Sequence, residues 1–189
     1  MLNIIPASSF KTVPWKNGKG ETTELAINPT GTLDNFQWRL SIASVIENGV
    51  FSDFSGYMRN LVLIEGDSIT LIHDDSKIDK LTKILDFATF YGGCQTLGKL
   101  TNGAIKDFNI ITSNTSCETR VQTFIAQTKQ SISFNGLVFA FSLSNSIELH
   151  DHQNIHHKVN QGDLLQLTHP QGIELSGKDL ILVYIKEIS

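Results

Sequence analysis

The sequence contains Leu61-Val62-Leu63-Ile64-Glu65-Gly66-Asp67-Ser68-Ile69-Thr70-Leu71-Ile72, in which two apolar runs flank the turn Glu65-Gly66-Asp67. Short apolar runs separated by a glycine-containing turn predict a β-hairpin. The same order of residue types returns in Leu137-Val138-Phe139-Ala140, a turn and Ser146-Ile147-Glu148-Leu149, and both copies end in His-Asp. This internal repeat indicates two successive barrels in one chain. We expect the boundary between them near residues 113 to 130.

Strand-like patterns dominate the rest of the chain, and helical periodicity is hard to find. From Phe36 to Val45 the residues alternate, so that Trp38 and Leu40 share one face while Arg39 and Ser41 share the other. Further strands are predicted at Ile84 to Thr89, Phe108 to Thr112, Thr119 to Ala126, Leu137 to Leu143, Ser146 to Leu149, Asp163 to Thr168, Ile173 to Leu175 and Leu180 to Ile185. So many short, closely spaced strands predict an all-β sandwich or barrel.

The composition is that of an ordinary globular protein. The chain has 189 residues and a formal net charge of -4, and its three arginines are Arg39, Arg59 and Arg120. An electrostatic footprint for nucleic acid is therefore absent. We see no basic leader and no apolar run of membrane-spanning length, and we expect a cytosolic protein with no membrane partner. Cys94 and Cys117 form neither a CxxC pair nor a disulfide framework.

A glycine-rich turn near the N-terminus is the first candidate for a ligand site. It lies in Trp15-Lys16-Asn17-Gly18-Lys19-Gly20 and is followed by the extended segment Glu21-Thr22-Thr23-Glu24. The period of two in a strand places Thr22 and Glu24 on one face. Two interpretations stand: a hairpin turn before a half-exposed strand, or a glycine turn that lets the backbone approach a ligand.

Two arginines lie in strand-like segments. Arg39 shares a face with Ser41, and Arg59 precedes the apolar run at Leu61. The guanidinium group of Arg39, in a strand with one packed face, needs a partner, because an unpaired buried charge is costly. That partner is either an internal carboxylate, Glu24 or Glu65, or the carboxylate of a ligand, which the planar arginine fork matches.

Asp107 and Asn109 point the same way if their segment is a strand. They either line the same cavity as the arginines or satisfy local backbone groups in a turn.

The histidines form the remaining cluster. His150, His152, His156 and His157 lie within eight residues, and this spacing is typical of cupin metal sites. The glutamate expected after the HxH pair is missing. A solvated polar loop is therefore the preferred interpretation, and we predict no metal site and no cofactor.

Read together, these motifs resemble the HutD/Ves family. The motifs that carry the resemblance extend over about residues 10 to 112 and are Trp15 to Glu24, Trp38 to Ala43, Gly49 to Gly56 with Arg59, Leu63 to Gly66, and Asp107 to Asn109. The resemblance implies an all-β bicupin: two tandem small β-barrels or jelly rolls of the cupin type (double-stranded β-helix), usually dimeric and without the metal ligands of catalytic cupins. We place the first barrel at residues 1–115 and the second at 116–189, and leave an exchange of strands between them open.

The resemblance also implies a function. HutD members look like accessory or regulatory proteins of histidine utilisation, whereas the role of Ves members is obscure. The favoured ligand is a small anionic metabolite of the formylglutamate, urocanate or formate class. The binding residues carried over by motif are Trp15, Asn17, Thr22, Glu24, Arg39, Ser41, Arg59, Asp107 and Asn109. Lys19 departs from the family pattern, which usually has glycine there.

An enzyme is the alternative hypothesis. It would be an isomerase, an epimerase or a metal-dependent oxygenase acting on a small acid or sugar. Its chemistry would come from a metal held by His150, His152 and His156, or from general acid–base catalysis by Glu24 with Asp107.

Overall fold

The chain folds into two units of paired β-sheets. The computed structural model describes residues 1–15, 18, 20–151, 153 and 155–188. One unit is Phe10–Cys117, and the other combines Met1–Ser9 with Glu118–Ser189. The first nine residues therefore lie with the C-terminal part of the chain, through β1 (Leu2–Ile5), which pairs with β17 (Leu164–Thr168).

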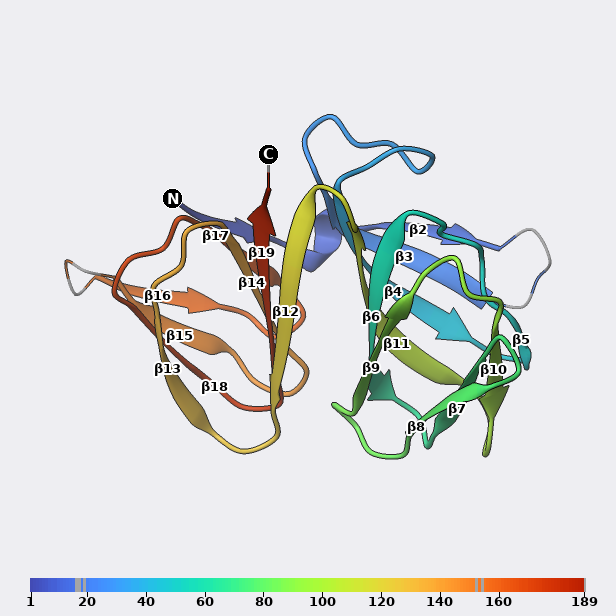
Figure 1. Cartoon of the computed structure of the whole chain (residues 1–189). Helices are drawn as coiled ribbons and strands as arrows, with labels where there is room; N and C mark the ends of the chain where they lie inside the picture. Colours follow the sequence, from blue (N-terminus) through green and yellow to red (C-terminus); the bar gives the residue numbers. More distant parts are fainter. Residues whose placement is uncertain (16–17, 19, 152, 154, 189) are drawn as a thin grey trace. The chain divides into compact units, whose positions relative to one another are not determined.

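The unit Phe10–Cys117 has a six-stranded sheet in the order β2-β3-β4-β11-β6-β9 and a four-stranded sheet in the order β5-β10-β7-β8 (Figure 1). Its strands are β2 (Lys11–Pro14), β3 (Gly20–Ile27), β4 (Trp38–Val45), β5 (Gly49–Val50), β6 (Tyr57–Glu65), β7 (Ile69–His73), β8 (Lys77–Leu81), β9 (Phe87–Tyr91), β10 (Thr96–Leu100) and β11 (Ile105–Ser113).

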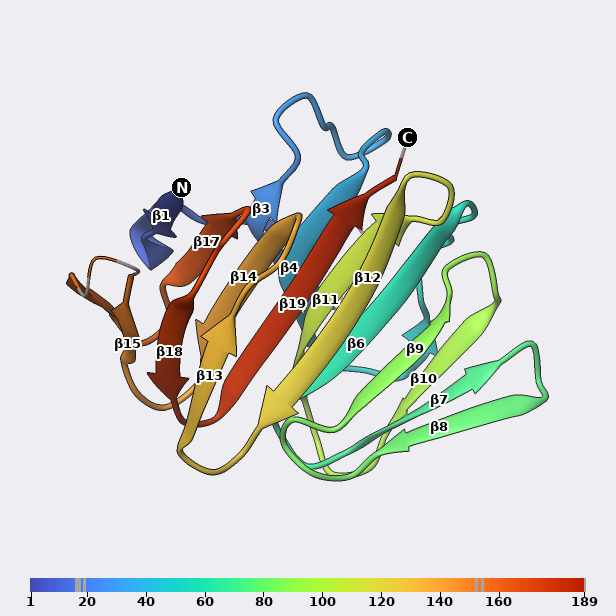
Figure 2. The same cartoon turned by 60° about the vertical axis from the view of Figure 1, so that its left-hand side comes forward.

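The other unit has sheets in the order β1-β17-β14-β19-β12 and β13-β18-β15-β16 (Figures 1 and 2). A short 3-10 helix, Ala7–Ser9, follows β1. The remaining strands are β12 (Cys117–Phe124), β13 (Thr128–Ile132), β14 (Leu137–Ser142), β15 (Ile147–His150), β16 (His156–Val159), β18 (Ile173–Gly177) and β19 (Leu180–Glu187).

The two units share one strand order. The run β4-β11-β6-β9 has its counterpart in β12-β19-β14-β17, and β5-β10-β7-β8 has its counterpart in β13-β18-β15-β16. Two facing four-stranded sheets connected in this way form a jelly roll. The all-β prediction is confirmed.

The predicted hairpin at residues 61 to 72 is wrong. Strand β6 pairs with β11 and β9, whereas β7 pairs with β10 and β8 in the other sheet. The apolar side chains of both strands, among them Leu61 and Leu71, belong to one buried cluster. They pack against each other across the two sheets, so the turn at Gly66 passes the chain from one sheet to the other. Gly66 has φ 95°, and a Cβ there would lie 2.6 Å from the carbonyl oxygen of Ala104, so only glycine fits this turn.

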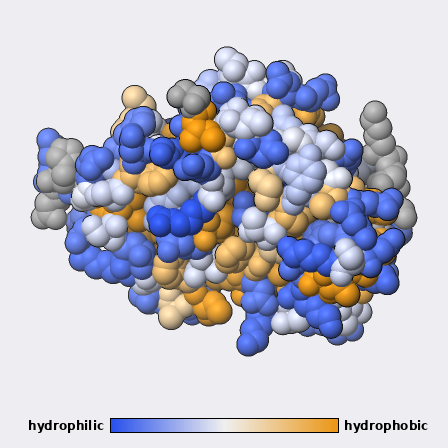
Figure 3. Space-filling model, viewed as in Figure 1, coloured by the Kyte–Doolittle hydropathy of each residue, from blue (hydrophilic) through white to orange (hydrophobic). Residues whose placement is uncertain are grey.

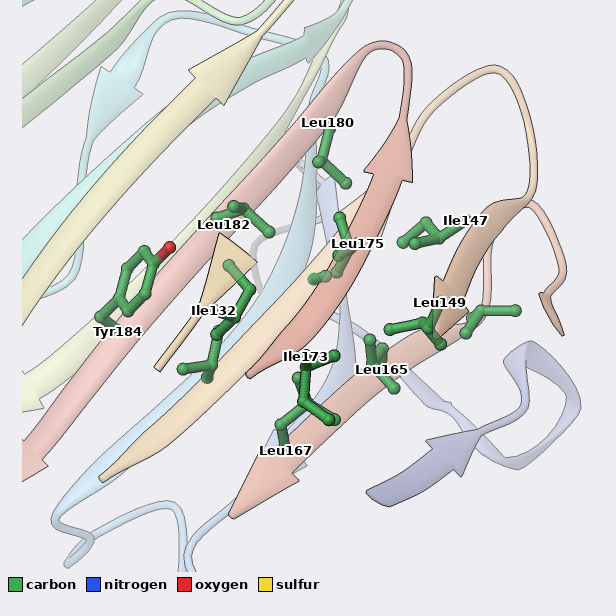
Figure 4. Close-up of a cluster of buried hydrophobic side chains, with 13 residues drawn as sticks. Ile132, Ile147, Leu149, Leu165, Leu167, Ile173, Leu175, Leu180, Leu182 and Tyr184 are labelled. Atoms are coloured by element: carbon green, nitrogen blue, oxygen red, sulfur yellow. The ribbon is translucent and has the colours of Figure 1, made fainter. Parts of the chain in front are cut away.

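Each unit has its own apolar core. In the unit that contains the C-terminal strands, aliphatic side chains from both sheets fill the interior, with Tyr184 beside them (Figure 4). The cluster consists of Ile132, Val138, Ala140, Ile147, Leu149, Val159, Leu165, Leu167, Ile173, Leu175, Leu180, Leu182 and Tyr184. The core of Phe10–Cys117 is smaller and consists of Val45, Leu61, Leu63, Ile69, Leu71, Leu81, Ala88, Phe90 and Ile105.

The surface mixes hydrophilic residues with scattered apolar ones in the view of Figure 3. Among the described residues, no helix is long and apolar enough to cross a membrane.

Candidate functional site

The interior of the unit Phe10–Cys117 is not filled completely. A cavity of about 810 Å³ lies within it and is lined by residues of β2, β3, β4, β6 and β11 and of the segment around β5. The predicted site residues that line it are Trp15, Thr22, Glu24, Arg39, Ser41, Arg59, Asp107 and Asn109. Asn17, the remaining predicted site residue, lies outside the described residues, as does Lys19.

Strand register explains why these side chains converge. In the six-stranded sheet, β11 lies between β4 and β6. Ile111 is opposite Arg39 on one side and Arg59 on the other. Two residues earlier on β11, Asn109 is opposite Ser41 on β4 and Leu61 on β6. Because side chains two residues apart point to the same face, polar groups from three strands share one surface of the cavity.

Arg39 has an internal partner. Its Nε donates to Oε2 of Glu24 at 2.8 Å, and Arg39 is buried while the Glu24 side chain is partly exposed. Of the two carboxylates considered from the sequence, Glu24 therefore pairs with Arg39. Glu65 pairs instead with Lys106, at 2.8 Å.

Arg59 is held differently. Its Nη2 donates to Oδ1 of Asn109 at 2.9 Å, and its guanidinium carbon lies 5.1 to 5.4 Å from the centres of the Phe51, Phe54 and Phe90 rings. Its Nε is buried and has no hydrogen-bond partner among the described residues. Burial lowers the pKa of Arg59 to about 10, and the nearby charge of Asp107 opposes that shift. The group therefore stays positively charged at neutral pH.

Asp107 is the most buried polar residue of the site, with no exposed surface. Asn109 Nδ2 donates to its Oδ1, whereas its Oδ2 has no partner in the described part of the chain. Burial raises the pKa of Asp107 to about 7, although the positive charge of Arg59 and the hydrogen bond from Asn109 act in the opposite direction. The raised pKa follows because burial penalises the charged form of a carboxyl group.

The N-terminal turn contributes Trp15 to the wall of the cavity. The indole Nε1 of Trp15 donates to Oγ1 of Thr22 at 2.8 Å, and its backbone N–H donates to the carbonyl of Gly20 at 2.9 Å. A Cβ at Gly20 would lie 2.1 Å from the carbonyl oxygen of Ser44 and 3.1 Å from the Trp15 ring. Glycine is thus required at position 20 by close packing of strand, turn and ring.

We expect Gly20→Ala to lower the free energy of unfolding by about 1 to 3 kcal/mol, the usual cost of forcing an extra carbon into a packed site. The measurement is urea unfolding followed by tryptophan fluorescence. Gly49→Ala is the matched control, because a Cβ at Gly49 meets no atom within 4 Å. Equal stability of the two variants would contradict the packing described for Gly20.

Several lining residues had no role in the sequence analysis. Phe51 and Phe54 were part of a quoted motif, but their contact with Arg59 depends on a loop folding over the sheet, which strand periodicity does not predict. Val13, Leu33 and Val50 line the cavity and are 58%, 61% and 61% exposed. These apolar side chains leave part of the cavity lining in contact with solvent.

The described histidines of the cluster lie in the other unit, His150 on β15 and His156 and His157 on β16. His150 is opposite His156, and His156 Nε2 lies 2.5 Å from Oε2 of Glu148. His152 lies outside the described residues, so the three-histidine hypothesis is not tested. Among the residues that the structure describes, no group of three or more His, Cys, Asp or Glu side chains is placed to hold a metal ion.

Comparison with known proteins gives a family match. The family model described as HutD matches residues 7–183. An uncharacterized 21.2 kDa protein of the hutC 3' region in Pseudomonas putida is 37% identical over 148 residues, which are 78% of this chain and 77% of that protein. Protein Ves of Escherichia fergusonii is 39% identical over 129 residues, or 68% of this chain and 66% of that protein.

Solved structures agree with the fold. The structure of HutD from Pseudomonas fluorescens SBW25 (formate condition) is 28% identical in sequence, with full coverage of both chains and a TM-score of 0.85. A cupin 2 conserved barrel domain protein from Leptotrichia buccalis is 8% identical, with coverage of 93% and 96% and a TM-score of 0.55; that likeness concerns the fold alone. The predicted tandem cupin fold is confirmed.

Proposed function

The chain belongs to the HutD family, and we propose that the cavity of its Phe10–Cys117 unit binds a small carboxylate in an accessory or regulatory role linked to histidine utilisation. The observation that carries the proposal is Arg59, a buried cation on the cavity wall whose Nε has no hydrogen-bond partner in the described part of the chain. A carboxylate supplies an acceptor for that N–H and the opposite charge.

The two arginines have different roles in this proposal. Arg39 is already paired with Glu24, whereas the hydrogen bond of Arg59 goes to a neutral amide. Arg59 is therefore the primary anchor, and the Arg39–Glu24 pair presents a polar wall beside it. No metal or cofactor is needed, because arginine itself provides the positive charge.

The walls suit a small acid with a short carbon skeleton. Trp15, Phe51 and Val45 line the same cavity as the polar residues. Pockets that combine apolar walls with a few convergent polar groups are typical of small-molecule sites. Formate, urocanate and N-formylglutamate are the candidate ligands, and they differ in how much of the apolar wall they would cover.

The test is calorimetric titration of the native protein with these three acids. We expect at least one to bind, and we expect Arg59→Gln to weaken its binding by about 10- to 100-fold, since a hydrogen bond to a charged group contributes about 1.5 to 3 kcal/mol. Arg120→Gln is the matched control, because Arg120 is exposed and lies over Tyr184 in the other unit. Failure of all three acids to bind, or equal binding by the Arg59 variant, would overturn the proposal.

An acid–base enzyme is the second candidate, and one observation favours it. A carboxyl group with a pKa of about 7 in a cavity, as in Asp107, suits proton transfer near neutral pH. Glu24, the other residue of the acid–base hypothesis, is already paired with Arg39. Formation of a product from a bound acid, detected by NMR and lost in Asp107→Asn, would favour the enzyme over the binding protein.

The homodimer and the cytoplasmic location stay predictions. Light scattering of the purified protein tests the first, and fractionation of the source cells tests the second.

A further inference from the structure

Three side chains at the cavity wall form one hydrogen-bonded network: Arg59, Asn109 and Asp107. Arg59 donates to the amide oxygen of Asn109, and the amide nitrogen of Asn109 donates to Asp107. All three residues are at most 5% exposed. At each end of this network, one buried polar atom has no partner among the described residues: Nε of Arg59 and Oδ2 of Asp107.

We propose that a carboxylate enters this site together with a proton, which Asp107 holds. In the complex, Arg59 pairs with the ligand carboxylate, and the protonated carboxyl of Asp107 donates a hydrogen bond through its free oxygen. The inference rests on the proposed function, since it assigns a proton to the same anion site.

The proton is needed because of the net charge that Arg59, Asp107 and the ligand would carry together. With Asp107 ionised, Arg59 and Asp107 together carry no net charge, and an entering anion would leave one uncompensated negative charge in a buried site. An uncompensated buried charge is expensive, and the usual response is a change of protonation. Protonation of Asp107 removes that charge and also turns a repelling oxygen into a donor.

Among the residues that the structure describes, the neighbours of Asp107 offer no other charge to take over this role. Opposite Asp107 in the sheet are Ala43 on β4 and Leu63 on β6, neither of which titrates. Beside Asp107 on β11, Lys106 pairs with Glu65. Elsewhere on the cavity wall, Arg39 and Glu24 neutralise each other.

Two further charged residues of the described part of the chain line the cavity, and both are exposed: Lys11 on β2, and Glu47 in the segment before β5. Water screens charges at the surface, so their influence on Asp107 is weak compared with that of Arg59.

The consequence is a pH-dependent affinity. While Asp107 is already protonated, below its pKa of about 7, the binding affinity is constant. Above that value each complex formed must take up a proton, so the dissociation constant rises about tenfold per pH unit. A ligand such as formate, whose own carboxyl is fully ionised in this range, contributes no pH dependence.

The experiment uses the native protein with formate, and with N-formylglutamate as a second probe, titrated calorimetrically from about pH 6 to about pH 9. At the alkaline end, titrations in buffers of different ionisation enthalpy should reveal uptake of about one proton per ligand bound. Asp107→Asn should bind without proton uptake and with a flat pH profile, because its amide is a permanent donor. At the alkaline end it should bind more tightly than the native protein.

Three outcomes are distinguishable. Binding by the native protein with a constant affinity and no buffer-dependent heat would overturn the proton-coupled inference and leave the carboxylate-binding proposal in place. A native pH dependence that persists in Asp107→Asn would assign the proton to another group and overturn the inference. Absence of binding by both probes and by urocanate at every pH would overturn the proposed function and, with it, the inference.

Discussion

Asp107→Asn is expected to stabilise the protein at about pH 8 and to have much less effect near pH 4. In the folded protein the pKa of Asp107 is about 7, against an ordinary value of 3.8. The folded state thus holds a proton that the unfolded state has released, and stability is lost as the pH rises from about 4 to about 7. Asparagine does not ionise and avoids this loss, which has an upper limit on the order of 4 kcal/mol.

The measurement is urea unfolding of both proteins across this pH range. Tryptophan fluorescence is the suitable probe, because Trp15 and Trp38 both lie in the unit Phe10–Cys117 that contains Asp107. Glu65→Gln is the control: Glu65 pairs with Lys106 at the surface, and such pairs contribute about 0 to 1 kcal/mol. If the native protein and Asp107→Asn lose stability in parallel between about pH 4 and about pH 7, Asp107 ionises with an ordinary pKa.

Strand periodicity predicted the faces of the strands well but not the pairing between them. The alternation in residues 36 to 45 placed Arg39 and Ser41 on one face, and both line the cavity. The same rule could not separate β6 from β7, because a period of two tells which side chains share a face and not which sheet a strand joins. The glycine turn between them allows a hairpin and a passage between sheets equally well.

The convergence of the described candidate residues on one cavity was predictable, but their chemical arrangement was not. The sequence left open whether Arg39 pairs with Glu24, with Glu65 or with a ligand. That distinction depends on the neighbouring positions of β3, β4, β11 and β6, and these are contacts between residues far apart in the chain. The burial of Asp107, and therefore its raised pKa, depends on the same long-range packing.

The two units show how one strand order can serve two purposes. Strand β11 presents Asp107 and Asn109 to the interior of its unit, whereas its counterpart β19 presents Leu180 and Leu182 to an apolar core. A hydrophobic interior stabilises a jelly roll, and polar side chains there reduce that stabilisation. The polar cavity of Phe10–Cys117 therefore comes at some cost in stability, whereas the other unit gains the full stabilisation of an apolar interior.

Leu149→Ala is therefore expected to lower the free energy of unfolding by about 2 to 5 kcal/mol, the range for a leucine truncated in a packed core. Leu149 is fully buried on β15, opposite Leu175 on β18, and belongs to the aliphatic cluster of Figure 4. Its truncation removes apolar contacts and leaves a cavity, because the surrounding structure relaxes only partially.

Urea unfolding followed by far-ultraviolet circular dichroism measures this effect, because the signal reports the strands of both units. Ile125→Ala is the matched control: Ile125 lies in the same unit and is 62% exposed, and substitutions at such positions usually change stability by less than about 0.5 kcal/mol. A Leu149 variant as stable as the Ile125 variant would mean that this interior is loosely packed.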